Sequence, residues 1–390
     1  MDHHGTLVCA VCFTEPELSS YVEQNGEVGE CSYCGRDEVI VAELDEVTGY
    51  LEERLRTEYS TADEEGLPWD EEEQRYFPES FDIRDVFDRE FGGVPGNDAD
   101  LRQALVNALS DQIWCQKDAM ALTRREGLSS GWQNFCHNIK HDTRYLFFRK
   151  ERKSIESEHE FVPPAEMLLE LGELIREFDL VRVIDPGAVF YRVRWDSEGK
   201  TYDSPADLGP PPEKFAGQSR MSAAGIPMMY MAANEDTALA ETRDSQGGAA
   251  SFATFRIIEP VRVLEMVNIP GVPSILAAGG QRRRDNLKFL FEFKMDISRS
   301  IERDKKIHYE YSPTQVVTEY FRRAFQTSDG KVVEGVAYPS SRGDGDNVVL
   351  FFDRTNVKGV ADDYLPTNGR KRVELVQVRH QRFLPGGEVT

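Results

Sequence analysis

The sequence predicts an α+β protein of several domains, and three observations lead to this fold class. The chain has 390 residues, more than one hydrophobic core usually organises. Hydrophobic residues make up 40% of it and aromatic residues 10%, enough to pack several interiors. Along the chain, paired cysteines give way to a helical period and then to short strands alternating with helices. We therefore expect a small zinc ribbon, an all-helical domain and a mixed α/β domain, in that order.

The charge balance limits the class of partner. The chain has 46 Lys and Arg against 69 Asp and Glu, and its net charge of −23 repels phosphate backbones and anionic membranes. Nucleic acid is thus disfavoured as a partner. No stretch approaches the roughly 20 apolar residues of a membrane span, and the apolar run at residues 7–13 lacks the basic flank of a signal peptide. We expect a soluble, cytoplasmic protein without membrane contact.

The first expected domain, residues 1–45, is predicted by cysteines. Two C-x-x-C pairs separated by eighteen residues have the spacing of a zinc ribbon: Cys9, Cys12, Cys31 and Cys34. Each pair directs two thiolates at one point, and Gly35 suits the tight turn that follows the second pair. Thiols in a reducing compartment bind metal rather than form disulfides. We predict a structural zinc held by these four cysteines, and we do not expect His3 and His4 to be ligands.

Residues 46–160 are expected to form the helical domain. The acidic runs at residues 63–65 and 70–73 suggest a solvated linker. Apolar residues then recur at helical spacing, and the positions concerned are Leu101, Leu105, Leu109, Ile113, Trp132, Phe135 and Ile139. Prolines 163 and 164 end this pattern. Residues 161–180 are expected to be a linker with one more helix, over 166–178.

Residues 181–390 are expected to form one domain of strands and two helices. One helix follows Asn234, which suits an N-cap, and the other begins with a capping box at residues 312–315. The expected strands are short and rich in β-branched and aromatic residues; they cover residues 181–195, 228–231, 251–257, 261–267, 335–338, 347–352 and 373–378.

Three segments of this half carry polar residues that point to chemistry when they are taken together. They are Tyr191-Arg192, the stretch from Arg220 through Gly225 and Tyr230 to Glu241, and the run Tyr338-Pro339-Ser340 followed by Asn347. Each residue alone has an ordinary explanation, such as a surface ion pair, a solvated helix position or a turn. In this order and spacing they resemble the RES family, which is named for an arginine, a glutamate and a serine. Its members include bacterial toxins that degrade NAD.

The resemblance covers about half of the chain and implies both a fold and a set of site residues. It implies a sheet similar to that of ADP-ribosyltransferases, with NAD as the substrate. The implied catalytic residues are Arg192, Glu241 and Ser340, and the implied substrate contacts are Arg220, Gly225, Tyr230 and Asn347. The asparagine and proline that the family usually has between its arginine and glycine are absent here.

Elementary chemistry agrees with these residue types. An arginine fork, at Arg192 or Arg220, suits the phosphates of NAD. A carboxylate such as Glu241 stabilises the oxocarbenium-like ribose that forms as nicotinamide leaves. Ser340 can orient that carboxylate or the ribose, and Tyr230 can stack on the nicotinamide. The cleavage itself needs no metal.

The helical half resembles the HEPN-type domains that accompany some RES domains, through the run WQNFCHNIKHDTRYLFF. HEPN nucleases carry an arginine and a histidine four to six residues apart, and Arg152 and His159 have six residues between them. Lys153 departs from the residue type that usually follows the arginine. We interpret the domain as a degenerate HEPN domain with a structural or sensing role rather than as an active nuclease. His137 and His141 lie one helical turn apart and, without a third ligand, are expected to pack or cap.

These features predict an enzyme that breaks the nicotinamide–ribose bond of NAD, either as a glycohydrolase or as a phosphorolase. A toxin or antiviral defence effector with regulatory N-terminal domains fits this activity. Because it depletes NAD, restraint is expected from an antitoxin, from a trigger protein acting on the N-terminal domains, or from a homo-oligomer. Three alternatives stay open: ADP-ribosyl transfer to a macromolecule, an RNA-binding or RNA-cutting HEPN module with a non-catalytic NAD-binding domain, and an NAD sensor without turnover.

Overall fold

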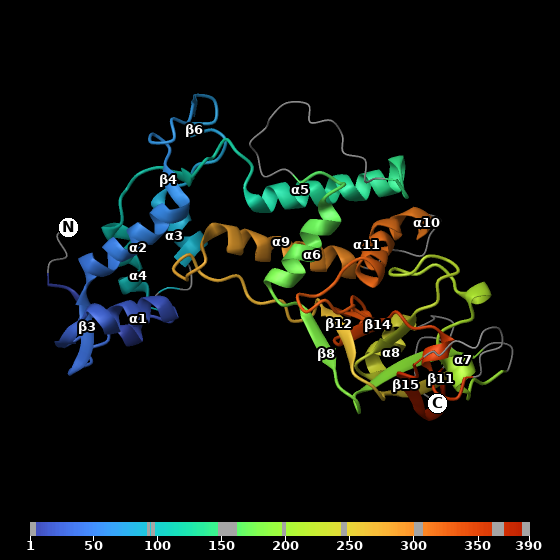
Figure 1. Ribbon diagram of the computed structural model, residues 1–390. Coiled ribbons are helices and arrows are strands. Elements are labelled where there is room, and N and C mark those ends of the chain that lie inside the picture. Colours follow the sequence, from blue (N-terminus) through green and yellow to red (C-terminus); the bar gives the residue numbers. More distant parts are fainter. Residues whose placement is uncertain are drawn as a thin grey trace. The chain divides into compact units, whose positions relative to one another are not determined.

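The computed structural model describes residues 5–91, 94, 98–146, 162–196, 200–242, 248–299, 307–360 and 370–383. These belong to two compact units (Figure 1). The first unit comprises Met1–Glu126 and Gly271–Lys288, and the second comprises Gly127–Pro270 and Phe289–Thr390. Helix α9 (Gly280–Ser298) therefore contributes residues to both units. The domain boundaries expected from the sequence remain a prediction.

The first unit opens with a small antiparallel sheet that carries the cysteines. Its strand order is β1 (Leu7–Cys9), β3 (Val39–Glu43) and β2 (Glu27–Gly29). A 3-10 turn, Ala10–Cys12, leads toward helix α1 (Pro16–Asn25), which starts at a proline and buries two aliphatic side chains. Proline is favoured in the first helical turn because its missing N–H has no partner there in any case. The sheet thus places the first C-x-x-C pair beside a helix that anchors it.

The rest of the first unit is not all-helical, which corrects the expected fold. Helices α2 (Leu44–Glu58), α3 (Ile83–Phe91) and α4 (Ala99–Ala108) are joined by a ladder of β4 (Tyr59–Thr61) and β7 (Trp114–Gln116). Helix α4 ends at residue 108, so the four-residue apolar period that runs on to Ile113 does not continue the helix. Bulky and β-branched side chains in these three-residue strands favour pairing.

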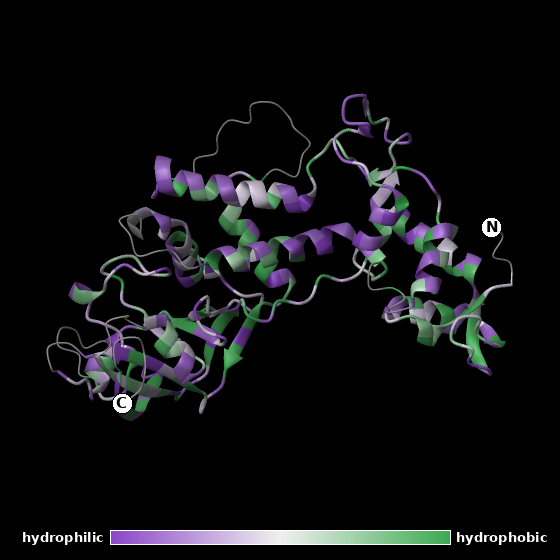
Figure 2. Cartoon of the chain, turned by 180° about the vertical axis from the view of Figure 1, so that it is seen from behind, coloured by the Kyte–Doolittle hydropathy of each residue, from purple (hydrophilic) through white to green (hydrophobic). Residues whose placement is uncertain are grey.

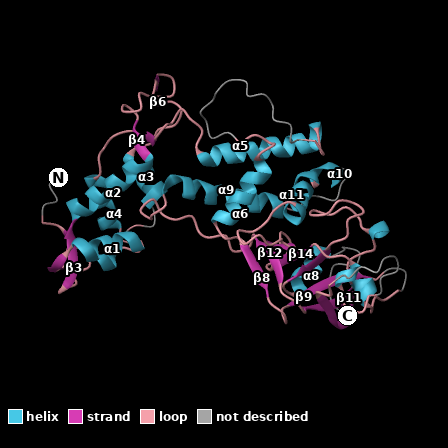
Figure 3. Ribbon diagram, viewed as in Figure 1, coloured by secondary structure: helices cyan, strands magenta, loops and turns pink. Residues whose placement is uncertain are grey.

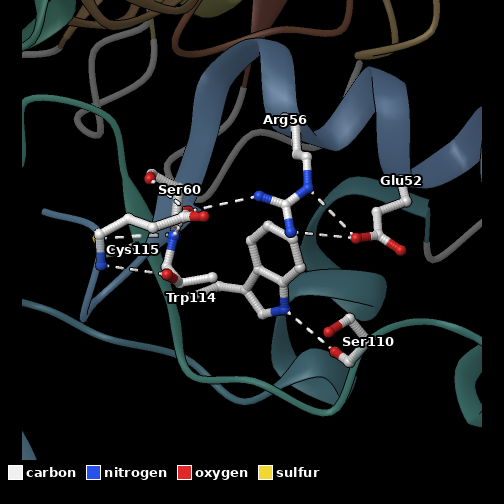
Figure 4. A network of polar contacts seen from close by, with 8 residues as sticks. Glu52, Arg56, Ser60, Ser110, Trp114 and Cys115 are labelled. Carbon is white, nitrogen blue, oxygen red and sulfur yellow. Dashed lines mark hydrogen bonds and ion pairs between the residues drawn. The ribbon is translucent and has the colours of Figure 1, made fainter.

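The β4–β7 ladder is held by a network of polar contacts (Figure 4). Arg56 donates to Glu52 at 3.2 Å and lies over the Trp114 ring, 5.0 Å from its centroid. The Trp114 indole donates to the Ser110 carbonyl at 3.3 Å, and the Cys115 thiol donates to the Ser60 carbonyl at 3.7 Å. Trp114 and Cys115 are fully buried. These contacts therefore hold helix α2 against strand β7.

The expected acidic linker is a hairpin instead. Strands β5 (Trp69–Asp70) and β6 (Arg75–Tyr76) pair antiparallel, and the Trp69 and Tyr76 rings meet edge to face with centroids 5.1 Å apart. Asp70 accepts from the backbone N–H groups of Glu72 and Glu73, which closes the turn. Side-chain-to-backbone bonds of this kind stabilise turns without an apolar core.

A buried ion cluster joins α9 to the other helices of the first unit. Arg284 pairs with Glu58 and with Glu90, and all three side chains are at most 7% exposed. The Tyr59 hydroxyl also donates to Glu90, at 2.7 Å. Helix α9 was not expected from the sequence, because its apolar residues share the helix with a run of arginines that hides their period. Arg284 in its charged first half is buried here by pairing.

The second unit contains a single eight-stranded sheet in the order β15-β11-β9-β10-β14-β13-β12-β8. All neighbouring pairs are antiparallel except β12 and β13, which are parallel. Six of the seven expected strands are confirmed, with shifts at their ends, whereas the segment expected as a strand over 181–195 forms two strands, β8 and β9, that are not neighbours in the sheet. The strand bounds are β8 Val181–Ile184, β9 Val189–Trp195, β10 Met229–Ala232, β11 Gly248–Ile257, β12 Val261–Glu265, β13 Gly335–Pro339, β14 Asp346–Leu350 and β15 Val373–Phe383.

Helices of the second unit form a layer of their own (Figure 3). The layer contains α5 (Arg124–His137), α6 (Met167–Glu177), α11 (Ser312–Arg323) and the second half of α9. Cross-links between α5 and α9 run from Ser129 to Glu292, at 2.6 Å, and from the Trp132 indole to Asp296, at 2.7 Å. Helix α6 confirms the helix expected over 166–178. Green apolar and purple polar faces alternate around these helices (Figure 2), as one-sided burial requires.

Short helices complete the second unit. Helix α8 (Glu235–Thr242) confirms the helix expected after Asn234, whose side-chain oxygen accepts from the Thr237 N–H at 2.7 Å. Helices α7 (Pro205–Leu208) and α10 (Ile307–Glu310) are single turns. In the described part of the chain, no helix is long and apolar enough to cross a membrane.

Candidate functional site

The four cysteines of the first unit converge on one point. The Sγ atoms of Cys9 and Cys12 are 3.7 Å apart, those of Cys9 and Cys34 are 3.5 Å apart, and those of Cys12 and Cys31 are 3.7 Å apart. All four lie within 4.8 Å of one another. Tetrahedral zinc with Zn–S bonds of about 2.3 Å requires sulfur atoms about 3.8 Å apart. The cluster therefore fits a structural metal such as zinc.

Local backbone geometry supports this cluster. The Cys9 N–H donates to the Cys31 sulfur at 3.3 Å, so one ligand is held by the backbone of another. Gly35 adopts a φ of 64°, which closes the turn after the second pair as expected. The nearby histidines His3 and His4, which we do not expect to be zinc ligands, lie outside the described residues.

In the second unit, Glu241 is the centre of a polar constellation. It lies in the last turn of α8 and is half-buried. The Ser340 hydroxyl donates to Glu241 Oε1 at 2.7 Å, and the Asn347 amide donates to the same oxygen at 2.6 Å. Within the described residues, Oε2 accepts no hydrogen bond from the protein. One carboxylate oxygen is thus held by two donors, and the other is available to a ligand.

The turn between β13 and β14 places Ser340 in this arrangement. Its hydroxyl oxygen accepts from the N–H groups of Arg342 and Gly343, both at 3.0 Å, so its single proton points to Glu241. Gly345 N–H donates to Thr237 Oγ1 at 3.1 Å. A Cβ on Gly345 would lie 2.6 Å from that oxygen, so only glycine lets the turn approach α8 this closely.

Arg220 lies on a loop held by α11, and Tyr230 lies in strand β10, which follows this loop. The Tyr230 hydroxyl bonds to Ser222 Oγ at 3.1 Å and accepts from the Met221 N–H at 3.3 Å. Burial raises the pKa of Tyr230, so the phenol stays neutral. Arg220 donates to the Ile297 carbonyl at the end of α9, at 2.9 Å. Within this loop, Gly225 has a φ of 86° and thus occupies a glycine-favoured position.

The first turn of α11 holds this loop, and this overturns the expected capping box. The N-cap is Tyr311, and Gln315 does not reach back to it. The Gln315 amide donates instead to the carbonyls of Ser219 and Ser222, at 2.8 and 3.1 Å. Thr314 Oγ1 donates to the Arg220 carbonyl at 2.6 Å. The polar residues of this turn therefore order the loop rather than the helix end.

Within the described residues, no hydrogen bond or ion pair joins Arg192 to Glu241, although Tyr230 is among the groups that influence the pKa of Arg192. Arg192 pairs with Ala253 across β9 and β11, while its neighbour Tyr191 pairs with Ala232 on β10. Because side chains alternate along a strand, the Arg192 Cβ points to the sheet face opposite that of Tyr191. Burial, and secondarily Arg194, lowers the pKa of Arg192 to about 10. Its Nη1 atom is buried and has no hydrogen-bond partner in the described structure.

One residue near Glu241 was given no role by the sequence. Tyr338 pairs with Asn347 across β13 and β14, on the same face, and Arg220 lies over its ring at 5.8 Å. The available signal was its place directly before Pro339 and Ser340. The helical candidates stand apart from this group. The rings of His137 and His141 are 5.1 Å apart, while Arg152 and His159 lie outside the described residues.

Comparison with protein-family models gives two matches. Residues 24–153 match the HEPN/RES N-terminal domain 1, and residues 189–367 match the RES domain. No curated protein and no solved structure matches the chain. The RES match contains Glu241, Ser340 and Asn347, and the N-terminal match contains the second cysteine pair. RES domains are a family of NAD-degrading toxin domains. The chain therefore combines a HEPN/RES N-terminal domain, preceded by the first half of a four-cysteine cluster, with a RES domain.

Proposed function

We propose that the RES domain of this chain cleaves the nicotinamide–ribose bond of NAD, with water or phosphate as the nucleophile. The observation that carries this proposal is the Glu241 carboxylate, which two donors hold by one oxygen. As the bond breaks, positive charge develops on the ribose, as in glycoside hydrolysis. A carboxylate that is already oriented stabilises that charge without reorganising during the reaction.

The reaction balances without an external oxidant or reductant. The bond between ribose C1′ and the pyridinium nitrogen breaks, and its electron pair leaves with neutral nicotinamide. With water, the oxygen bonds to C1′ and a proton is released, giving ADP-ribose. With phosphate, the product is ADP-ribose 1″-phosphate. The free Oε2 of Glu241 can accept a ribose hydroxyl proton in a hydrogen bond or orient the incoming nucleophile.

Substrate contacts come from the loop that α11 holds. Arg220 lies over the ring of Tyr338, and it suits a diphosphate oxygen. Tyr230 and Gly225 form part of the same loop and strand segment, where a nicotinamide ring can be accommodated. The buried guanidinium of Arg192 lacks a partner for Nη1 among the described residues and lies within electrostatic reach of Tyr230, so it is proposed to support the site.

The deciding experiment measures nicotinamide release from NAD by the purified full-length chain, with and without phosphate. Glu241→Gln keeps the size of the side chain but loses its charge, and we expect release to fall by about 100-fold or more. Asp236→Asn is the matched control, because Asp236 is an exposed carboxylate on the same helix. Phosphate dependence of the wild-type rate identifies the nucleophile. Equal rates for Glu241→Gln and wild type would refute the role of Glu241.

ADP-ribosyl transfer is separated from cleavage by the fate of the label. NAD labelled in its adenine half should yield only small products if the proposal is correct. Label recovered on protein or nucleic acid, with Glu241→Gln as the control, would replace cleavage by transfer. A wild-type chain that binds NAD but releases no nicotinamide under either condition would be a sensor instead.

We further propose that the N-terminal part restrains this activity and responds to a basic protein partner. Residues 1–126 contain 31 Asp and Glu but only 10 Lys and Arg, whereas residues 127–390 contain 38 and 36. Almost all of the net charge thus belongs to the N-terminal part, and it attracts cationic surfaces. An antitoxin or trigger protein of basic character fits this surface. Co-expression of such a partner should change NAD loss in cells, and this change should weaken as salt is raised in the purified system.

A further inference from the structure

Tyr338 has a hydroxyl that the described residues leave without a partner. Its side chain is 6% exposed, yet its hydroxyl makes no hydrogen bond within the described part of the chain. A phenylalanine would pack equally well if packing were the only role of the side chain. The hydroxyl is therefore available to a ligand.

The position of Tyr338 shows where that partner would lie. Tyr338 and Asn347 are directly opposite each other on β13 and β14, so their Cβ atoms are about 5 Å apart on the same face. The Asn347 amide holds Glu241, and Ser340, which also holds Glu241, follows two residues after Tyr338. Tyr338 thus lies beside both residues that donate to the Glu241 carboxylate.

The charges around Tyr338 define what it can do. Burial raises the pKa of its phenol; Arg220 opposes this rise, and Tyr230, Glu241 and Tyr311 reinforce it. The hydroxyl consequently stays protonated and can donate a hydrogen bond. The guanidinium of Arg220 lies 5.8 Å from the ring centroid, within the range of a cation–π contact.

We infer that Tyr338 is a substrate-binding residue of the RES domain, whose hydroxyl donates to an acceptor oxygen of the nicotinamide–ribose half of NAD while its ring supports Arg220. This inference rests on the proposed function. It gives a role to a hydroxyl that lies near the carboxylate and has no hydrogen-bond partner among the described residues. It also gives the site a means of discrimination, because a ligand that lacks the acceptor oxygen leaves the hydroxyl unpaired.

The test compares Tyr338→Phe with Tyr338→Leu in the full-length chain. The first keeps the ring beneath Arg220 and removes only the hydroxyl, and the second removes both. Tyr320→Phe on α11 is the matched control, because Tyr320 is a partly buried tyrosine outside the Glu241 group. NAD affinity is measured by calorimetry in the Glu241→Gln background, in which turnover is slow, and KM and kcat are measured in the active chain.

We expect Tyr338→Phe to weaken NAD binding about 10-fold, which is the size of effect of one hydrogen bond. KM should rise more than kcat falls. The thermal midpoint without NAD should stay the same, since no protein hydrogen bond is lost, whereas the upward shift caused by NAD should shrink. Tyr338→Leu should bind NAD more weakly still, and Tyr320→Phe should bind like its parent.

Two failures are distinguishable. If the parent chain neither binds nor cleaves NAD, the proposed function is wrong and this inference falls with it. If the parent binds NAD and Tyr338→Phe binds it equally well, only the role of Tyr338 is overturned. A lower thermal midpoint for Tyr338→Phe in the absence of NAD, with unchanged affinity, would show that the hydroxyl serves the fold rather than the ligand.

Discussion

Removal of the Ser340 hydroxyl tests whether catalysis depends on the orientation of Glu241. Ser340→Ala deletes one of the two donors to Oε1, the one at 2.7 Å, and leaves the Asn347 donor at 2.6 Å. A hydrogen bond to a charged group contributes about 1.5–3 kcal/mol. If this energy is realised in the transition state, kcat/KM for NAD should fall about 10- to 100-fold. Ser341→Ala, in the same turn but with an exposed side chain, should leave kcat/KM unchanged.

The double substitution sharpens this test. Ser340→Ala and Asn347→Ala remove donors to one oxygen, so their effects should not multiply, and the combined loss should be smaller than the product of the single losses. Nicotinamide release gives the rates, and thermal unfolding verifies that each variant folds. The reasoning is refuted if Ser340→Ala retains kcat/KM within twofold of wild type, or if the two effects multiply fully.

Three further predictions concern the metal, the ion cluster and the loop. Cys12→Ser should abolish binding of one zinc per chain and destabilise the N-terminal part, whereas Cys136→Ser should keep the metal, as elemental analysis and thermal unfolding will show. Arg284→Met should lower the free energy of unfolding in urea by about 3–5 kcal/mol, because buried carboxylates lose their cation. Burial raises the pKa of Glu58, which makes the ionised form of this carboxyl the unfavourable one. The loss of stability in Arg284→Met should therefore be full at pH values above that pKa and become smaller as the pH falls through it. A loss that does not change with pH would contradict this explanation. Thr314→Val should raise KM for NAD about fivefold with little change in kcat, since it frees the carbonyl that anchors the loop; an unchanged KM would exclude that role.

Local sequence patterns predicted the second unit better than the first. The strands and the helix after Asn234 were visible because apolar alternation and capping act over a few residues. The N-terminal helical domain was mispredicted, because β4 and β7 pair across more than fifty residues and three-residue strands leave no period to detect. Helix α9 was missed for a related reason. Its arginines resemble a solvated surface in the sequence, and the carboxylates of α2 and α3 make the burial of Arg284 acceptable.

For the candidate site, too, some features could be predicted from the sequence and others depended on the fold. The residue types of Glu241, Ser340 and Asn347 and the spacing of the cysteines were readable in the sequence, because the chemistry of a site limits which side chains can serve it. The sequence could not show that both donors reach one oxygen of Glu241, that Arg192 and Tyr191 alternate between the two faces of β9, or that Tyr338 lies opposite Asn347.

Those features depend on strand register, on pairing between segments about a hundred residues apart, and on the close approach that Gly345 permits. A shift of one residue in register would exchange the two faces of a strand, although it leaves the composition and the motifs unchanged. The sequence by itself therefore determined which chemical groups the protein carries and the class of domain that holds them. Only the tertiary structure decided which of those groups meet, because register and sheet order are set by packing across the whole unit.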